Sequence, residues 1–270
     1  MICYQKNIDL LLKQNTSALI KEMKEAKLFR TNLSVITLKE MTNLLIDRSN
    51  ISVAVCNANS LVRGARSGSM AQMLNTMSHK ICDGYPLSKA INILYGLNQE
   101  RVDGYNLFLS TLKSGLKKNT SHYFFGNEEK VVKKMINEIK LKFPDVNITG
   151  YHCPPILEWR EFTTPKYLNM LEDTNSDIIW ISLGFPKQEK FMEYLVGNKV
   201  RDYNILGVGN VFDWTAKTRY KAPEIFAKNG LEWLFRFSQE PIRLARRYLI
   251  DNTLFILFFL KQYFRGEDSF

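Results

Sequence analysis

Short apolar runs of strand length alternate with helical patterns along most of this chain. One helical pattern, 128–143, places apolar side chains at i, i+4 and i+8 on a single face. The apolar runs lie at 51–55, 122–125, 146–149, 177–183 and 204–208. This alternation predicts an α/β fold with a Rossmann-like, mostly parallel sheet and helices on both faces. Such sheets bind ligands at the carboxyl ends of their strands, so chemistry is expected in the loops that follow the strands.

Both ends of the chain also carry helical patterns. Apolar residues at helical spacing among lysines and glutamates over 8–27 predict an amphipathic helix within residues 1–30. Near the other end, Pro241 cannot continue a helix and is suited to begin one, which leaves 230–239 and 241–264 as two helical segments. The predicted fold therefore includes a helical C-terminal appendage.

Charge distinguishes this appendage from the rest of the chain. The 270 residues contain 37 Lys and Arg against 27 Asp and Glu, which gives a net charge of +10 and a pI of about 9.3. Half of the excess lies between Arg219 and Arg265, where nine basic residues stand against four acidic ones. We divide the chain into an α/β domain, residues 1–230, and a basic appendage, residues 231–270. The charge predicts an anionic partner: a nucleic acid, an acidic membrane lipid or a phosphorylated small molecule.

The cysteines and the apolar runs indicate the cellular compartment in which the protein is expected. The four cysteines form no CxxC pair and we recognise no secretion or transit signal, so a reduced, cytosolic compartment is expected. The run 254–260 has seven apolar residues, far fewer than the roughly 20 that a membrane-spanning helix needs. It is suited to lie on a membrane surface and not to cross the membrane.

Asp83 is the first candidate for chemistry. It follows a short apolar run and precedes Gly84. Two interpretations stay open for it: a turn residue, or a general base at the carboxyl end of a strand.

Two other loops contain glycine after a strand. In one, Gly184 and Pro186 predict a helix start with free N–H groups, and Gln188 can both donate to and accept from a sugar hydroxyl or a uracil edge. In the other, Gly207 and Gly209 lack the third glycine of the dinucleotide fingerprint. Two interpretations fit this second loop: the glycines relieve a tight turn after the strand, or they let the backbone approach a nucleotide phosphate.

Several familiar motifs are absent from the sequence. No Asp-x-Asp pair is present to hold a divalent ion against a sugar nucleotide, and no Walker-type loop is present for nucleotide phosphates. The three histidines share no ligand spacing with one another or with the cysteines, so no metal site is expected.

Seven segments in one order resemble the WecG/TagA/CpsF family of bacterial glycosyltransferases, which is glycosyltransferase family 26. Together they cover about residues 30 to 255. The segments are VCNANSL (55–61), CDGYPLSKA (82–90), ERVDGYNLF (100–108), YFFGNEE (123–129), SLGFPKQEKF (182–191), GVGNVFDWTAKTRYKAP (207–223) and GLEWLFRFSQEPIRLARRYL (230–249).

The resemblance implies an inverting, metal-independent hexosyltransferase that uses no cofactor. Such an enzyme moves a sugar, of the N-acetylmannosamine type or a related hexose, from a UDP-sugar donor to a polyprenyl-diphosphate-linked sugar during bacterial cell-wall or capsule polysaccharide biosynthesis. Residues 1–230 would then be the catalytic domain. The appendage, 231–270, would dock on the anionic inner face of the cell membrane, so the enzyme would be cytoplasmic and peripheral. Family members self-associate, so a homo-oligomer is allowed, whereas no nucleic-acid partner is expected.

The resemblance also implies roles for single residues. Asp83 matches the proposed catalytic base of the family, and Arg101 matches an arginine that can hold the diphosphate leaving group bidentately. The positions assigned to substrate binding are Asn57, Asn59, Gly84, Gly104, Asn106, Gly126, Gly184, Pro186, Gln188, Glu189, Gly209, Phe212 and Asp213. The positions assigned to the lipid diphosphate or the membrane are Arg236, Arg243, Arg246 and Arg247.

Four positions depart from the family pattern. Val55 stands where many members have a threonine, and Lys221 stands where an arginine is usual. Asp103 and Asn106 lie at altered positions of the third motif. We expect these departures to bear on the identity of the donor sugar.

Two other classes of protein stay open. Aromatic residues interleaved with arginines in the appendage also suit a basic nucleic-acid-binding protein, although the sequence has no helix-turn-helix, zinc or RNP-type signature. The incomplete glycine fingerprint also leaves a Rossmann-type oxidoreductase as a third interpretation.

Overall fold

A six-stranded parallel sheet forms the centre of the molecule. The computed structural model describes residues 24–198, 203–223, 225–226 and 230–270, without the side chains of residues 243, 246–248 and 268. The strand order is β4-β3-β8-β7-β5-β6, and every pairing is parallel. The strands are β3 (Ser52–Cys56), β4 (His79–Cys82), β5 (Ser121–Gly126), β6 (Asn147–His152), β7 (Ile178–Ser182) and β8 (Asn204–Gly207).

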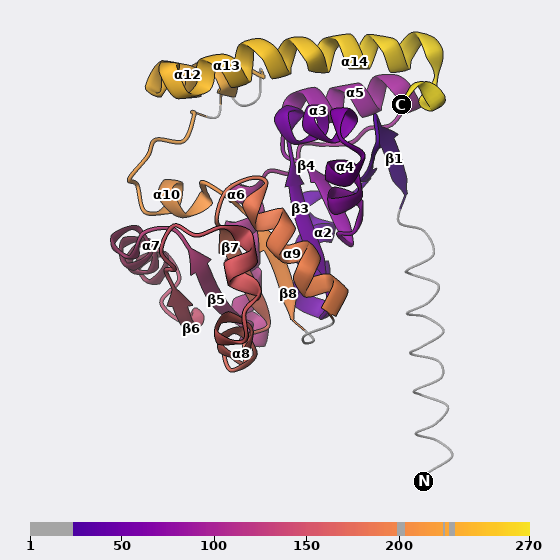
Figure 1. Ribbon diagram of the computed structural model, residues 1–270. Helices are drawn as coiled ribbons and strands as arrows, with labels where there is room; N and C mark the ends of the chain where they lie inside the picture. The colour runs from indigo at the N-terminus through magenta and orange to yellow at the C-terminus, as the bar shows by residue number, and fades with distance from the viewer. Residues whose placement is uncertain (1–23, 199–202, 224, 227–229) are drawn as a thin grey trace, which may run out of the picture.

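Helices cover both faces of this sheet (Figure 1). Successive residues of a strand point to opposite faces, so Ile179 belongs to one buried cluster and Trp180 to the other. The first face packs against α3 (Ala58–Arg66), α4 (Gly68–Asn75), α5 (Tyr85–Tyr95), α8 (Pro165–Glu172) and α9 (Lys187–Asn198). The second face packs against α2 (Leu38–Asp47), α6 (Gly104–Gly115), α7 (Glu129–Lys142) and α10 (Val211–Thr215).

The predicted fold class is confirmed. Each of the five predicted apolar runs contains at least half of one strand, and the helix predicted over 128–143 is α7. A topological switch point lies between the neighbouring strands β3 and β8, because α3 follows β3 on one face and α10 follows β8 on the other.

The predicted N-terminal helix is wrong in its last residues. An antiparallel hairpin of β1 (Glu25–Leu28) and β2 (Thr31–Ser34) occupies the part that was expected to be helical up to residue 27 or 30. Its turn contains Phe29, whose side chain is fully buried. The rest of that predicted helix, 1–23, lies outside the described residues.

The C-terminal segment forms a row of helices along one side of the α/β unit (Figure 1). As predicted, a helix begins at Pro241. The second predicted segment is interrupted, because a π-helical turn, Arg247–Asp251, separates its two α-helices. The helices are α12 (Glu232–Gln239), α13 (Pro241–Arg246) and α14 (Asn252–Arg265).

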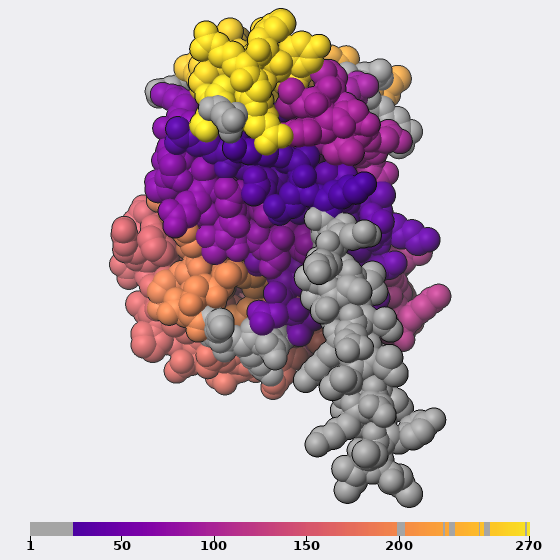
Figure 2. Space-filling model, turned by 90° about the vertical axis from the view of Figure 1, so that its right-hand side faces the viewer, coloured from indigo at the N-terminus to yellow at the C-terminus, as the bar shows by residue number. Residues whose placement is uncertain are grey.

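Aromatic contacts hold α14 against the hairpin. The ring of Phe29 lies 5.3 Å from that of Phe255, 5.7 Å from that of Phe258 and 5.2 Å from that of Phe270. Figure 2 shows the C-terminal residues seated directly on the N-terminal part of the α/β unit. Burial of these rings gives α14 a hydrophobic attachment to the first buried cluster.

Gln262 adds polar contacts at the same place. The Phe29 backbone N–H donates to Gln262 Oε1 at 2.8 Å, and Gln262 Nε2 donates to the Lys27 carbonyl at 2.9 Å. The Gln262 side chain is 2% exposed, so these hydrogen bonds are shielded from water.

Replacement of Gln262 by Leu is expected to lower the free energy of unfolding by about 1–3 kcal/mol, because the buried Phe29 N–H loses its acceptor and the Lys27 carbonyl keeps only the Tyr95 hydroxyl as a donor. Urea denaturation measures this. Arg265→Gln, at the exposed end of the same helix, is the control and is expected to stay within about 0.5 kcal/mol of the parent. Equal stability of the two variants would contradict the anchoring role of Gln262.

Candidate functional site

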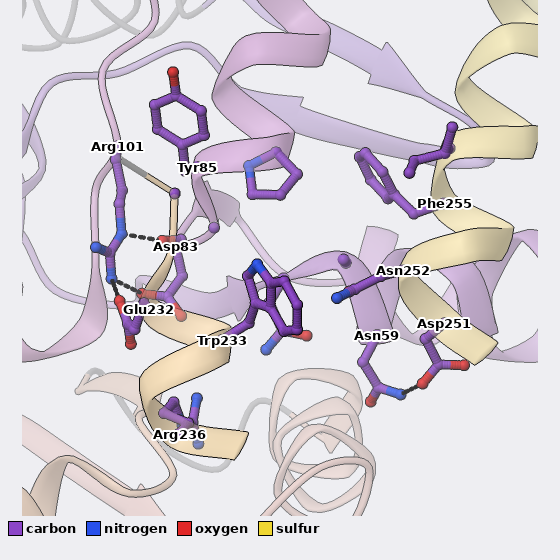
Figure 3. Close-up of a pocket in the computed structure, with 16 residues that line it drawn as sticks. Asn59, Asp83, Tyr85, Arg101, Glu232, Trp233, Arg236, Asp251, Asn252 and Phe255 are labelled. Carbon is purple, nitrogen blue, oxygen red and sulfur yellow. Dashed lines mark hydrogen bonds and ion pairs between the residues drawn. The ribbon is translucent and has the colours of Figure 1, made fainter. Parts of the chain in front are cut away.

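A cavity of about 300 Å³ lies where the loops after β3 and β4 meet the C-terminal helices. Figure 3 shows side chains from both parts pointing into it. Its lining residues are Asn57, Ala58, Asn59, Asp83, Gly84, Tyr85, Pro86, Arg101, Gly230, Glu232, Trp233, Arg236, Asp251, Asn252, Phe255 and Ile256. The sites predicted at Asn57, Asn59, Asp83, Gly84, Arg101 and Arg236 are thus brought together.

Asp83 lies at the end of β4 because the parallel ladder continues one residue beyond the strand. Its backbone N–H donates to the Cys56 carbonyl of β3 at 2.9 Å. The next segment returns beside it, since the Val102 N–H donates to the Cys82 carbonyl at 2.9 Å. These two backbone contacts place Asp83 and Arg101 beside each other at one edge of the cavity.

Arg101 bridges two carboxylates. Its Nε donates to the Asp83 carbonyl, and its terminal nitrogen lies 3.6 Å from the Asp83 carboxylate. The same nitrogen lies 2.6 Å from the carboxylate of Glu232, which begins α12. One guanidinium therefore links the sheet end to the appendage (Figure 3).

Burial raises the pKa of Asp83 to about 6. Arg101 opposes this shift, whereas Glu232 and Asp103 add to it by like-charge repulsion. The Asp83 side chain is still 24% exposed, so it can reach a ligand in the cavity. A carboxyl with this pKa is ionised at neutral pH and holds a proton more readily than an ordinary aspartate, as suits a general base.

Asn57 is the N-cap of α3 and Asn59 lies in its first turn, and both line the cavity. Asn57 caps the helix: its Oδ1 accepts from the Ser60 N–H at 3.3 Å, and its own N–H donates to Ser60 Oγ at 2.9 Å. Asn59 Nδ2 donates to the Asp251 carboxylate in the π-helical turn. Asn59 thus ties α3 to the appendage as well as lining the cavity.

Gly230 and Glu232 are site residues that sequence reasoning missed, although both lie in the last of the seven motifs. Gly230 has φ +71, and a Cβ there would lie 2.7 Å from the Tyr85 ring, so the backbone can approach that ring only at glycine. The one available signal for Glu232 was an acid in a basic segment. Trp233 and Tyr85 add the aromatic walls of the cavity.

Gln188 and Glu189 do not line the cavity. Gln188 is 4% exposed; its Oε1 accepts from the Gly184 N–H at 3.2 Å, and its Nε2 donates to Glu189 Oε1 at 2.8 Å. A Cβ at Gly207 would lie 2.7 Å from Gln188 Nε2, so the buried Gln188 side chain leaves room only for glycine at position 207. Glu189 is 2% exposed, and burial raises its pKa to about 7. α9 begins at Lys187, one residue after the predicted start at Pro186. The substrate roles of Pro186 and of the other three predicted positions here stay predictions.

Other predicted substrate positions lie around the ends of β5 and β8, outside the cavity. Phe212 is fully buried, and Asp213 accepts from Asn127 Nδ2 at 2.9 Å. Gly126 has φ +110, and a Cβ there would lie 2.4 Å from the Ser182 carbonyl oxygen. The backbone therefore requires glycine at this position, whether or not it contacts substrate. Gly209 has φ +55 in the loop after β8.

Two of the departures from the family pattern meet in space. Asp103 caps α6 by accepting from the Asn106 N–H at 3.0 Å and Nδ2 at 2.6 Å. Lys221 Nζ lies 3.5 Å from the Asp103 carboxylate and 4.2 Å from the Tyr105 ring centre. Gly104 allows α6 to approach Val55, since a Cβ there would lie 3.3 Å from a Val55 methyl group. None of these residues lines the cavity.

Of the four predicted arginines, Arg236 lines the cavity and lies 5.4 Å from the Trp214 ring centre. The side chains of Arg243, Arg246 and Arg247 lie outside the described residues.

Comparison with known proteins identifies the family. The family model described as "Glycosyl transferase WecG/TagA/CpsF family" matches residues 26–269. The chain belongs to this family. The match includes α12 to α14, so the helices that close the cavity are part of the family pattern.

The chain is similar to curated proteins that carry the name N-acetylglucosaminyldiphosphoundecaprenol N-acetyl-beta-D-mannosaminyltransferase. The one from Bacillus spizizenii is 29% identical over 157 residues, which is 57% of this chain and 58% of the relative. The one from Bacillus subtilis is 26% identical over 157 residues, again 57% of this chain and 58% of the relative. The one from Staphylococcus aureus strain MW2 is 22% identical over 198 residues, 73% of this chain and 76% of the relative. The chain thus spans less than two thirds of the two Bacillus relatives.

Asp83→Asn is expected to stabilise the protein at pH 7.5. The folded-state pKa lies above the ordinary value of 3.8, so stability falls as pH rises from about 4 to about 6, and the ionised carboxylate lowers it above that range. A neutral amide removes this cost, by on the order of 1 kcal/mol. Urea denaturation at pH 7.5 and pH 4 measures the difference, which is expected to shrink at pH 4. A variant clearly less stable than the parent at pH 7.5 would contradict this assignment.

Proposed function

We propose that this chain is an inverting, metal-independent glycosyltransferase. It transfers a sugar of the N-acetylmannosamine type, or a related hexose, from a UDP-sugar to a polyprenyl-diphosphate-linked sugar in cell-surface polysaccharide biosynthesis. The observation that carries the proposal is the Asp83–Arg101 pair in the cavity of a family member. The names of the relatives supply the substrate class. The family match gives no support to the nucleic-acid-binding alternative.

Asp83 acts as the general base. An acceptor hydroxyl transfers its proton to the Asp83 carboxylate while its oxygen forms a bond to C1 of the donor sugar. The bond from C1 to the UDP oxygen breaks on the opposite side of C1, so the configuration inverts. The pKa of about 6 supports this role, because the carboxylate is ionised at neutral pH yet basic enough to accept the proton.

Arg101 neutralises the leaving group. Departure of UDP places additional negative charge on the diphosphate oxygens, and a guanidinium stabilises that charge with two parallel hydrogen bonds. Arg236 supplies a second positive charge in the same cavity. Asn57 and Asn59 offer amide groups for sugar hydroxyls at the start of α3.

Activity is tested with purified protein, UDP-N-acetylmannosamine and GlcNAc-diphosphate-lipid. Asp83→Asn is expected to lower kcat by about 100- to 10,000-fold. In the parent, kcat/KM is expected to fall about tenfold per pH unit below pH 6, because protonated Asp83 cannot accept a proton.

Asp251→Asn is the matched control, since it removes another carboxylate of the cavity and is expected to keep the acid limb of the pH profile. Near-parent turnover by Asp83→Asn would disprove the base assignment. The same assay with EDTA tests metal independence, and a panel of UDP-sugars tests the donor. No product with any donor would contradict the proposed function.

The appendage is proposed to dock on the anionic inner face of the cell membrane. Support comes from α14, where residues at helical spacing carry apolar side chains that are 41–77% exposed. These residues are Ile256, Leu257, Leu260, Tyr263 and Phe264. Within the described part of the chain no helix combines the length and apolar character required to cross a bilayer. Apolar insertion together with basic charge gives reversible attachment to a surface.

Leu257→Glu combined with Leu260→Glu is expected to weaken binding to anionic vesicles, by on the order of 1 kcal/mol for each leucine. Vesicle co-sedimentation measures the fraction of protein bound. Leu141→Glu is the control, because Leu141 is an 80% exposed leucine on α7, outside the appendage. Equal vesicle binding by both variants would contradict docking through α14.

A further inference from the structure

The face of α12 toward the α/β domain is made of charged side chains. Glu232, Arg236 and Glu240 are spaced by four residues, so they lie on one side of the helix and its C-terminal cap. Glu232 pairs with Arg101 at 2.6 Å, and Glu240 pairs with Arg219 at 3.0 Å. Between them, Arg236 lies over the Trp214 ring. Polar and cation–π contacts at three successive turns therefore hold α12 in place.

Hydrophobic burial contributes less to this contact than it does at α14. No side chain of α12 is fully buried, and Trp233 and Leu234 are 40% and 44% exposed. By contrast, α14 buries Phe255 and Gln262. The π-helical turn, Arg247–Asp251, lies between the two regions. The Glu232–Arg101 pair can therefore break without the loss of a buried hydrophobic contact of α12.

The Glu232 carboxylate occupies a position that an anionic ligand would need. Its oxygen is 1 Å closer to the Arg101 terminal nitrogen than the Asp83 carboxylate is, at 2.6 Å against 3.6 Å. Carboxylate and phosphate oxygens bind guanidinium groups through the same hydrogen-bond geometry. Both Glu232 and Arg101 are only 18% exposed, so the pair is well shielded from competing water.

The charges of the cavity also indicate that Glu232 competes with an anionic ligand for Arg101. Its lining contains three carboxylates, from Asp83, Glu232 and Asp251, against the two guanidinium groups of Arg101 and Arg236. A nucleoside diphosphate that entered this arrangement would add negative charge beside three carboxylates. Removal of Glu232 from Arg101 takes away one carboxylate and frees one cationic partner at the same time.

We infer that Glu232 is an internal ligand of Arg101 that a nucleoside diphosphate must displace, so that diphosphate binding is coupled to rupture of the Glu232–Arg101 ion pair while Arg236 stays in the cavity. The inference rests on the proposed function and adds a residue to it. Glu232 keeps Arg101 paired when no ligand is present. Because the displacement opposes binding, the affinity for the diphosphate is lower than the cavity would otherwise provide.

The test is isothermal titration calorimetry with UDP as the probe, on the full chain at pH 7.5 and constant salt. Glu232→Gln is expected to bind UDP about fivefold or more tightly than the parent. Glu240→Gln is the matched control: it breaks the other ion pair of the same helix face, outside the cavity, and is expected to stay within about twofold of the parent. Uridine, which has no phosphate, is expected to bind the parent and Glu232→Gln equally.

Other outcomes overturn the inference. Equal or weaker UDP binding by Glu232→Gln, while the parent binds UDP and forms product, refutes the internal ligand and leaves the proposed function standing. A similar gain in both variants shows that general loosening of α12 is the cause, which also refutes it. If no protein binds UDP and none forms product, the proposed function and the inference fall together. Circular dichroism checks folding, and Glu232→Ala is a second variant for which the same gain is expected.

Discussion

The Arg101 guanidinium is the contact on which the site depends. It holds the carboxylate at the end of β4 and the carboxylate at the start of α12 at once. Without this positive charge, two partly buried carboxylates would face each other across the cavity and repel. The position of Arg101 itself follows from backbone pairing, because the Val102 N–H extends the edge of the sheet beyond β4. Sheet geometry therefore determines where the charge of the cavity lies.

Two different kinds of attachment act within one row of helices. Aromatic rings and a buried amide hold α14, whereas two ion pairs and a cation–π contact link α12 to the α/β domain. Hydrophobic contacts persist at high salt, while partly exposed ion pairs weaken as ionic strength rises. The two ends of the appendage thus respond differently to their surroundings. Such a division suits a protein in which one helix stays on a surface and another covers a ligand site.

Periodicity was sufficient to predict most of the fold. The parallel strands are buried on both faces, so they appear in the sequence as short apolar runs, and β3 and β5 to β8 were found in this way. The hairpin 25–34 was missed because its short strands mix polar and apolar residues and follow a stretch with helical spacing. The π-helical turn at Arg247–Asp251 was missed because its sequence fits a continuous α-helix.

The site was predictable only in part. Asp83, Arg101 and Asn57 follow from motifs, and they line one cavity. Glu232 could not be paired with Arg101 from spacing, since the pairing depends on how the appendage lies over the sheet. Conversely, Gln188, Glu189 and Phe212 share motif segments with candidate residues, yet their side chains are buried. A motif indicates that a segment lies near a site but does not reveal which of its side chains face the ligand.

The hydrogen bond between Phe29 and Gln262 joins residues that are 233 positions apart in the chain. During synthesis, the amide in the hairpin turn can meet this partner only after the ribosome has added residue 262. By then all six strands of the sheet have been translated and can pair with one another. Attachment of α14 is therefore a late event in cotranslational folding, and until it occurs the Phe29 ring lacks the cover of Phe255, Phe258 and Phe270 and is available to chaperones.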